Sequence, residues 1–221
     1  MDAMNNKIIL AKSIPPRSND RGGMPLLKRH IPWHTIMISV GIILLHYLFM
    51  PLNALFIYNR SAIAQNEVWR LLTGHLVHYN FDHLFWNVLA FGIIGTTVEL
   101  KSLKRFYRAL LISFTGVGLW LWLGAYTLPE YSGLSGALNG LFVGAIWMEW
   151  KDTKQNYLIL ILLGAIAKII FELLTHQTIF MQPSEQCSSV PISHLAGLMS
   201  GFVFILFEIG LMKLKSNPSN I

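Results

Sequence analysis

The sequence predicts an all-α membrane protein, a bundle of six transmembrane helices with both ends of the chain in the cytoplasm. Its composition is the first indication of this class. Of its 221 residues, 53% are hydrophobic and only 13% are charged, whereas a soluble domain usually carries about 25% charged residues. The mean hydropathy is +0.49. Contact with lipid is the simplest way to accommodate this apolar excess.

Six apolar runs divide the chain, and most approach the roughly 20 residues that a helix needs to cross a bilayer. The fourth is among the shortest, at about 17 residues, or roughly 25 Å of helix against roughly 30 Å of hydrocarbon. We expect a six-helix core over residues 32–213, a basic and mostly disordered tail over 1–31, and a short tail over 214–221. The runs lie at residues 33–49, 81–98, 106–128, 134–150, 157–174 and 192–212.

The basic residues are distributed unevenly between the two sides of the membrane. Fourteen lysines and arginines lie on the side of the N-terminal tail, whereas the opposite side has only Arg60 and Arg70, and Lys168 lies inside a run. Because basic residues concentrate in cytoplasmic segments, both termini are predicted to be cytoplasmic. This orientation accounts for the formal net charge of +6, so we expect no nucleic-acid partner.

Several polar side chains occur inside or beside the apolar runs, where they are costly unless they have a role. Ser135 opens the fourth run, His194 lies near the start of the sixth, and His83 and Asn87 share one face of the second. The predicted topology places all four toward the extracytoplasmic side. A serine at a helix start lies beside free backbone N–H groups, which can stabilise an oxyanion. A histidine within reach of that serine would be its base.

Small residues recur at helical spacing behind both Ser135 and His194. Such spacing lets two helices pack backbone to backbone. If the two faces meet, Ser135 and His194 come within hydrogen-bonding reach. A Ser–His pair can act without an acidic third member, so we expect a dyad. The glycines concerned are Gly136, Gly140, Gly144, Gly197 and Gly201.

Further residues surround these motifs in a definite order. Trp69 and Arg70 precede the second run, and we expect them to anchor the first external loop. Glu99 follows that run, as a structural hydrogen-bonding group. The complete series is Trp69-Arg70, His78, His83-x-x-x-Asn87, Glu99, Gly133-Leu134-Ser135-Gly136 and His194-x-x-Gly197-x-x-x-Gly201.

In this order, over about residues 67–202, the motifs resemble those of the rhomboid family of intramembrane serine proteases. The resemblance implies that Ser135 attacks the scissile carbonyl and that His194 is the general base and then the acid. It implies an oxyanion hole formed by His83, Asn87 and the backbone N–H of Ser135. It implies no metal or other cofactor. The substrates would be transmembrane or membrane-proximal segments of other proteins. Supporting positions would be His78, Asn139, Gly133, Gly136 and Gly197.

Within the family, the chain is most similar to rhombosortases, a bacterial subgroup of about this length. The similarity lies in residues 133–142 and in Ala167-Lys168 with Glu172. It implies single-span substrates whose C-terminal tail combines a Gly-Gly motif, a hydrophobic span and a basic end. It also implies a multi-pass protein of the bacterial inner membrane with its active site toward the periplasm.

Two features of this subgroup comparison concern individual side chains. Asn139 stands where many rhomboids have an aromatic residue that stacks on the catalytic histidine. We expect its amide to bond His194 or substrate instead. Lys168 and Glu172 are four residues apart and are expected to form an ion pair, with contact to substrate as the alternative.

Less specific interpretations stay open for the same residues. Ser135 also suits a cap at the start of a buried helix, and His83 and Asn87 also suit contacts between helices. His78 suits structural support of the loop as well as a direct role. A metal site is another interpretation, but the spacing of the histidines puts them on different helix faces unless the segment is a loop. They are His75, which we expect at the interface, His78 and His83.

Two other classes of protein compete with a protease. A catalytically inactive, derlin-like relative would bind membrane substrates without cleaving them, but the chain has both Ser135 and His194. A small transporter would use the histidines as a proton relay. That class would show inverted halves and broken mid-membrane helices, and the sequence shows neither.

Overall fold

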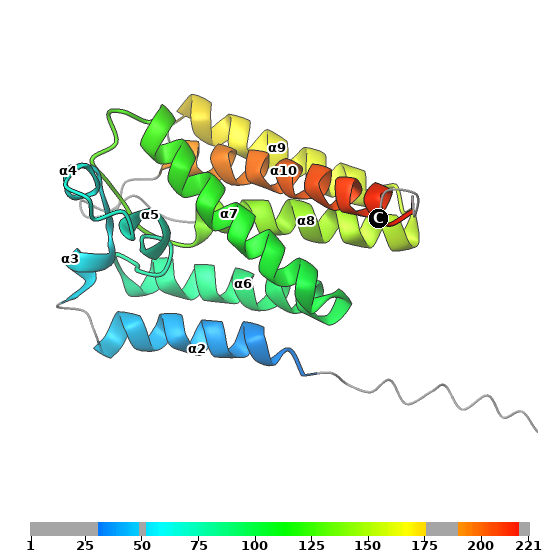
Figure 1. Cartoon of the computed structure of the whole chain (residues 1–221), viewed down its shortest axis with the longest axis horizontal. Coiled ribbons are helices and arrows are strands. Elements are labelled where there is room, and N and C mark those ends of the chain that lie inside the picture. The colour runs from blue at the N-terminus through cyan, green and yellow to red at the C-terminus, as the bar shows by residue number, and fades with distance from the viewer. Residues whose placement is uncertain (1–30, 49–51, 176–189, 217–221) are drawn as a thin grey trace, which may run out of the picture. The chain divides into compact units, whose positions relative to one another are not determined.

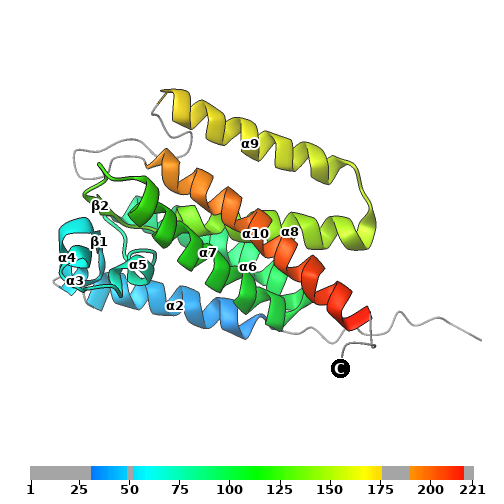
Figure 2. The same cartoon turned by 45° about the horizontal axis from the view of Figure 1, so that its top comes forward.

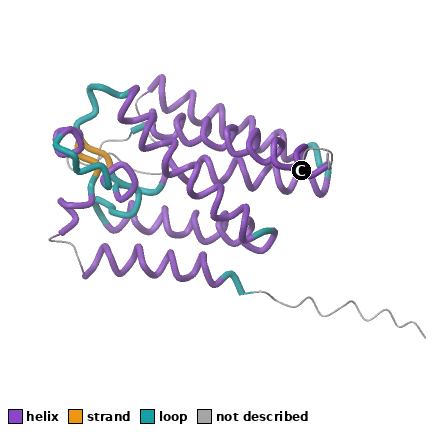
Figure 3. Tube along the Cα trace, in the orientation of Figure 1, coloured by secondary structure: helices purple, strands orange, loops and turns teal. Residues whose placement is uncertain are grey.

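The computed structural model describes residues 31–48, 52–175 and 190–216, and helices dominate these ranges (Figure 3). The described part contains six helices of 16 residues or more (Figure 1). These six are α2 (Trp33–Leu48), α6 (Phe81–Lys101), α7 (Leu103–Gly124), α8 (Ser135–Thr153), α9 (Tyr157–Thr175) and α10 (Pro191–Ser216). The smaller elements are α3 (Asn53–Phe56), β1 (Tyr58–Asn59), α4 (Arg60–Ala64), α5 (Arg70–Thr73) and β2 (Glu130–Tyr131).

Four of the long helices, α6, α7, α9 and α10, are long and apolar enough to cross a membrane. These helices indicate a multi-pass membrane protein. The apolar helix α2 has only 16 residues. The six-span topology and the cytoplasmic placement of the termini stay predictions.

Helix α8 lies at the centre of the bundle, in contact with α6, α7, α9 and α10. A helix enclosed by protein needs less apolar surface than one facing lipid, and α8 is accordingly rich in glycine and polar at its end. It has 19 residues and extends beyond the predicted run at a polar end, and the shortest of the six long helices is α2 with 16. Helix α9 packs mainly against α8 and α10 and lies at the edge of the bundle (Figure 2).

The third helix ends earlier than the sequence predicts, at Gly124 instead of residue 128. The Arg60 guanidinium donates to the carbonyls of Leu121 at 2.6 Å and Ala125 at 3.0 Å, and its Nε donates to that of Leu128 at 3.2 Å. Carbonyls at a helix end lack the regular set of intrahelical partners. The backbone N–H groups of Ala125 and Leu128 reach the carbonyls of Leu121 and Ala125. Arg60 adds further donors to both, which stabilises the end of the helix.

Two other boundaries also differ from the prediction. Ser102 separates α6 from α7, because its hydroxyl accepts a hydrogen bond from the Arg105 backbone N–H and begins a new helix. Helix α10 continues to Ser216, so the first three residues assigned to a C-terminal tail are helical. Most of the predicted N-terminal tail lies outside the described residues.

Helices α8 and α10 approach each other closely, and this approach depends on glycine. A Cβ at Gly197 would overlap with the carbonyl oxygen of Gly136, and one at Gly201 would lie 2.8 Å from that of Gly140. Small residues at this interval let helix backbones touch. The contact predicted between the two glycine faces is therefore present.

A compact loop structure covers the end of the bundle where α8 begins. Strand β1 pairs antiparallel with β2, with Tyr58 opposite Tyr131. The buried Arg70 side chain donates to the carbonyls of Ala54 at 2.6 Å and Ile57 at 2.9 Å, and Trp69 Nε1 donates to that of Leu55 at 3.2 Å. Trp69 and Arg70 thus anchor the loop, as expected.

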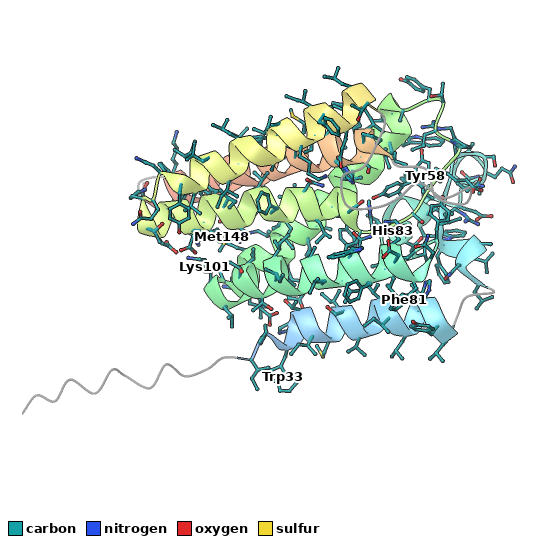
Figure 4. All side chains as sticks on the ribbon, turned by 180° about the vertical axis from the view of Figure 1, so that it is seen from behind. Trp33, Tyr58, Phe81, His83, Lys101 and Met148 are labelled. Carbon is teal, nitrogen blue, oxygen red and sulfur yellow. The ribbon has the colours of Figure 1, made fainter. Side chains whose placement is uncertain are left out.

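At the opposite end, Glu99 joins α6 to α2. Its Oε1 accepts from the His34 backbone N–H at 3.0 Å, and its Oε2 accepts from the Thr35 N–H and hydroxyl, both at 2.7 Å. These first-turn N–H groups would otherwise lack partners. Figure 4 shows the two ends, with His83 and Tyr58 at one and Trp33 and Lys101 at the other.

Candidate active site

Ser135 is the first residue of α8, and the segment before it is held in one conformation. Gly133 has φ +111°, a backbone conformation that side chains disfavour, and a Cβ there would overlap with the His83 imidazole. The Gly133 N–H donates to the carbonyl of Gly74 at 2.9 Å. The Gly133 carbonyl accepts a hydrogen bond from the Tyr131 hydroxyl at 2.6 Å. Burial raises the pKa of Tyr131, so that hydroxyl stays protonated and continues to donate.

His194 projects from the start of α10 toward Ser135. Its Nε2 lies 3.1 Å from the Ser135 Oγ, and the residue is 8% exposed. Ser193 holds the first turn of α10, since its N–H and hydroxyl both donate to the carbonyl of Val190, at 2.8 and 2.7 Å. The structure therefore brings Ser135 and His194 to the distance of a nucleophile and its base.

Glu172 on α9 occupies the other side of the His194 ring. Its Oε2 lies 2.7 Å from His194 Nδ1, and its Oε1 accepts from Lys168 Nζ at 2.6 Å. The expected ion pair between Lys168 and Glu172 is thus present. The contact with His194 was missed, because the sequence shows only that Lys168 and Glu172 are one turn apart. The signal available was one acidic residue, accompanied by only one lysine, inside a run that is apolar at nearly every other position.

His83 and Asn87 both face inward from α6, at 7% and 4% exposure. The His83 ring lies against Gly133 and interacts electrostatically with His194. The Asn80 side chain accepts from the His83 backbone N–H at 2.8 Å and caps the helix. Among the described residues, none accepts a hydrogen bond from the buried Asn87 Nδ2. Its two N–H groups are donors that an incoming oxyanion could use.

The other two histidines of this region lie in the loop before α6. His75 is buried within the protein, with Nε2 3.1 Å from the Phe114 carbonyl oxygen. Burial lowers its pKa to about 4. His78 packs edge-on against His83 at a ring distance of 5.1 Å, and burial lowers its pKa well below the usual value. Both rings are neutral at pH 7. No group of three metal-ligating side chains occurs within the described ranges.

The Asn139 amide nitrogen does not bond His194, the first of its two expected partners, and its contact with substrate stays a prediction. Nδ2 donates to the carbonyl of Ser135 at 2.8 Å, one turn earlier in α8. A side-chain amide four residues after a carbonyl reaches it easily within one helix. Gly136 and Gly197, expected as supporting residues, form the contact between α8 and α10 described above.

A cavity of about 230 Å³ adjoins the loop side of this cluster. Its lining includes His78, Ser132 and Asn53. Each of these residues carries a buried polar atom without a protein partner in the described part of the chain. The cavity therefore offers polar groups next to the Ser135 end of α8.

Comparison with known proteins places these features in context. The family profile named Rhomboid domain matches residues 65–210. Rhomboid protease GluP of Bacillus subtilis (strain 168) is 31% identical over 157 residues, which are 69% of this chain and 28% of that protein. Inactive rhomboid-related protein 2 of Caenorhabditis elegans is 29% identical over 150 residues, 64% of this chain and 41% of that protein.

YdcA of Bacillus subtilis (strain 168) is 25% identical over 186 residues, which are 79% of this chain and 87% of YdcA. The chain thus spans less than half the length of the first two relatives but most of the third.

Proposed function

The chain belongs to the rhomboid family, and from this premise we propose that it is an intramembrane serine endopeptidase. It would cleave transmembrane or membrane-proximal segments of other proteins in the lipid bilayer. The observation that carries the proposal is the 3.1 Å contact between Ser135 Oγ and His194 Nε2. The similarity to a rhomboid protease of Bacillus subtilis supports it.

The proposed chemistry is acyl transfer to Ser135. Its Oγ bonds to the scissile carbonyl carbon while its proton passes to His194 Nε2. The C–N bond then breaks as His194 gives that proton to the leaving amine. A water molecule next adds its oxygen to the acyl carbon and its proton to His194. The carboxyl product leaves as Ser135 regains a proton from His194. The polar cavity beside His78 supports a supply of water to this site.

The negative charge that develops on the substrate oxygen needs donors near Ser135. The proposed donors are the His83 ring, the Asn87 amide and the Ser135 backbone N–H. The burial of His83 and Asn87 supports this role, because fixed donors in a dry site stabilise an oxyanion more than donors in water do. His78 would hold the His83 ring from the loop side.

We further propose that the chain is a rhombosortase, whose substrates are proteins with a C-terminal Gly-Gly motif followed by a hydrophobic span and a basic end. The similarity of residues 133–142 and of Lys168 and Glu172 to that subgroup supports this. The protein would reside in a bacterial inner membrane with Ser135 toward the periplasm. Two bacterial relatives are consistent with this location.

A second candidate is an inactive rhomboid that binds membrane substrates without cleaving them. The similarity to an inactive rhomboid-related protein of Caenorhabditis elegans favours its consideration. The two candidates differ in whether Ser135 is activated. A fluorophosphonate probe reacts with an activated serine, so labelling of the detergent-purified protein distinguishes them.

We expect labelling of the wild type and loss of labelling in Ser135→Ala and His194→Ala. Ser61→Ala, which changes an exposed serine of the outer loop, is the matched control and should label normally. A wild type that is folded but unreactive toward both fluorophosphonate and β-lactam probes would favour the inactive candidate. Cleavage of a Gly-Gly-tailed substrate in proteoliposomes, compared with the same substrate carrying Val-Val, tests the specificity.

A further inference from the structure

We propose that Glu172 is a positioning residue of the active site and makes the expected dyad a Ser–His–Glu triad. This inference rests on the proposed serine protease function. Ser135 Oγ lies 3.1 Å from His194 Nε2, and His194 Nδ1 lies 2.7 Å from Glu172 Oε2. The three side chains form a continuous line, with a hydroxyl and a carboxylate on opposite sides of one imidazole.

The carboxylate selects the tautomer of His194. A neutral imidazole carries one N–H, and the partner of the other nitrogen decides which nitrogen holds it. Glu172 Oε2 is an acceptor only, so the proton stays on Nδ1. Nε2 then presents its lone pair to Ser135, which is the form a general base requires. The same carboxylate stabilises the imidazolium when His194 accepts the serine proton.

Both oxygens of Glu172 are used, each for a different partner. The residue is 1% exposed, and a buried carboxylate without compensation is strongly unfavourable. Lys168 Nζ supplies the compensating charge at Oε1, from a side chain that is 25% exposed. An ion pair formed for stability alone would need only Oε1. The short contact from Oε2 to His194 is therefore an additional and specific feature.

The triad draws its members from three different helices. Ser135 belongs to α8, His194 to α10 and Glu172 to α9. Among the four helices long and apolar enough to cross a membrane, α9 is the least enclosed by the rest of the protein. Only 17% of its apolar stretch is buried. Its fully buried residues are Leu158, Ile169 and Glu172. Glu172 is thus the polar member of a small contact surface, and the position of α9 is coupled to the geometry of the base.

The first test compares Glu172→Gln and Glu172→Asp in cleavage assays with the full-length protein in proteoliposomes. Glu172→Gln keeps the size of the side chain but removes the charge and the obligatory acceptor. We expect kcat to fall on the order of 10³-fold with KM nearly unchanged. Glu172→Asp retains a carboxylate and should recover much of this loss.

The matched control is Glu208→Gln on α10. Glu208 is also a buried acid, at 2% exposure, but it is paired with Arg105 and Arg108 at the other end of the bundle.

A double variant keeps the test decisive if Glu172→Gln alone fails to fold because Lys168 loses its counterion. Lys168→Met with Glu172→Gln removes both charges and leaves no uncompensated ion in the helix. We expect it to fold and to show the same loss of kcat as Glu172→Gln. Recovery of wild-type kcat in the double variant would overturn the proposal, because the loss in Glu172→Gln would then come from removing the Glu172 charge beside Lys168.

A second measurement reads the tautomer without requiring catalysis. Nitrogen-15 NMR of the histidine side chains is recorded on Ser135→Ala, and the His194 signal is assigned by its loss in His194→Gln. With Glu172 present, His194 should be protonated at Nδ1. That signature should be lost in Glu172→Gln. A His194 ring protonated at Nε2 in both forms would reject the positioning role. If the wild type lacks activity while Nδ1 is protonated, the protease proposal fails and the inference about Glu172 geometry stands.

Discussion

Gly197 on α10 packs so closely against Gly136 on α8 that a Cβ at Gly197 would overlap with the Gly136 carbonyl oxygen. Ser135 lies one residue before Gly136, and His194 lies three residues before Gly197. The contact between the two glycines therefore sets the separation of the proposed nucleophile and base.

The substitution Gly197→Ala tests this relationship. An added methyl group forces α8 and α10 apart and lengthens the distance from Ser135 Oγ to His194 Nε2. We expect loss of fluorophosphonate labelling and a loss of about 1–3 kcal/mol in stability. Thermal unfolding in detergent measures the second effect. Gly210→Ala on the same helix is the control, since a Cβ at Gly210 would meet no atom within 4 Å. Normal labelling of Gly197→Ala would contradict the role of the glycine contact.

The substitution Asn87→Ala is expected to lower activity strongly while leaving stability nearly unchanged. The buried Asn87 Nδ2 makes no hydrogen bond to a described residue, so Asn87→Ala removes a donor that contributes little to folding. We expect kcat to fall about 10²–10³-fold while stability changes by less than about 1 kcal/mol.

The reciprocal control is Asn59→Ala. The Asn59 side chain accepts from the Ala62 N–H at 2.9 Å and caps α4, so its loss should lower stability by about 1 kcal/mol without lowering kcat. A comparable fall in stability for Asn87→Ala, with kcat preserved, would assign Asn87 to contacts between helices.

The buried loop histidines predict a loss of stability in mild acid. Burial lowers the pKa of His75 to about 4 and that of His78 well below its usual value. An unfolded chain binds the proton at about pH 6.5, so acid favours the unfolded state. The contribution of His75 is complete above about pH 6.5 and is lost as the pH falls from about 6.5 to about 4, by on the order of 3 kcal/mol.

Thermal unfolding midpoints measured from pH 7.5 to pH 5 check this expectation. His75→Gln keeps an N–H that can donate to the Phe114 carbonyl but does not titrate, so its midpoint should depend less on pH than that of the wild type. Equal slopes for the two proteins would show that another group controls the acid sensitivity.

The apolar runs alone identified the positions of the six long helices in the described residues. An apolar stretch of helical length is a local property, and lipid accepts little else. The glycine intervals also predicted which faces of α8 and α10 meet, because close backbone approach requires small side chains. The order of the polar motifs pointed to Ser135 and His194. The structure brings their side chains together, while their chemical roles stay proposals.

The tertiary structure alone decided the contacts that join distant segments. The pairing of Lys168 with Glu172 was visible because the two are one helical turn apart, but His194 is 22 positions further along the chain. Its contact with Glu172 depends on how α9 and α10 are rotated about their axes, which packing determines. The same reason applies to Arg60 at the start of α4, whose guanidinium bonds carbonyls at the end of α7 more than 60 residues later in the chain. Local sequence determines which segments are helical, and packing determines which of their polar atoms meet.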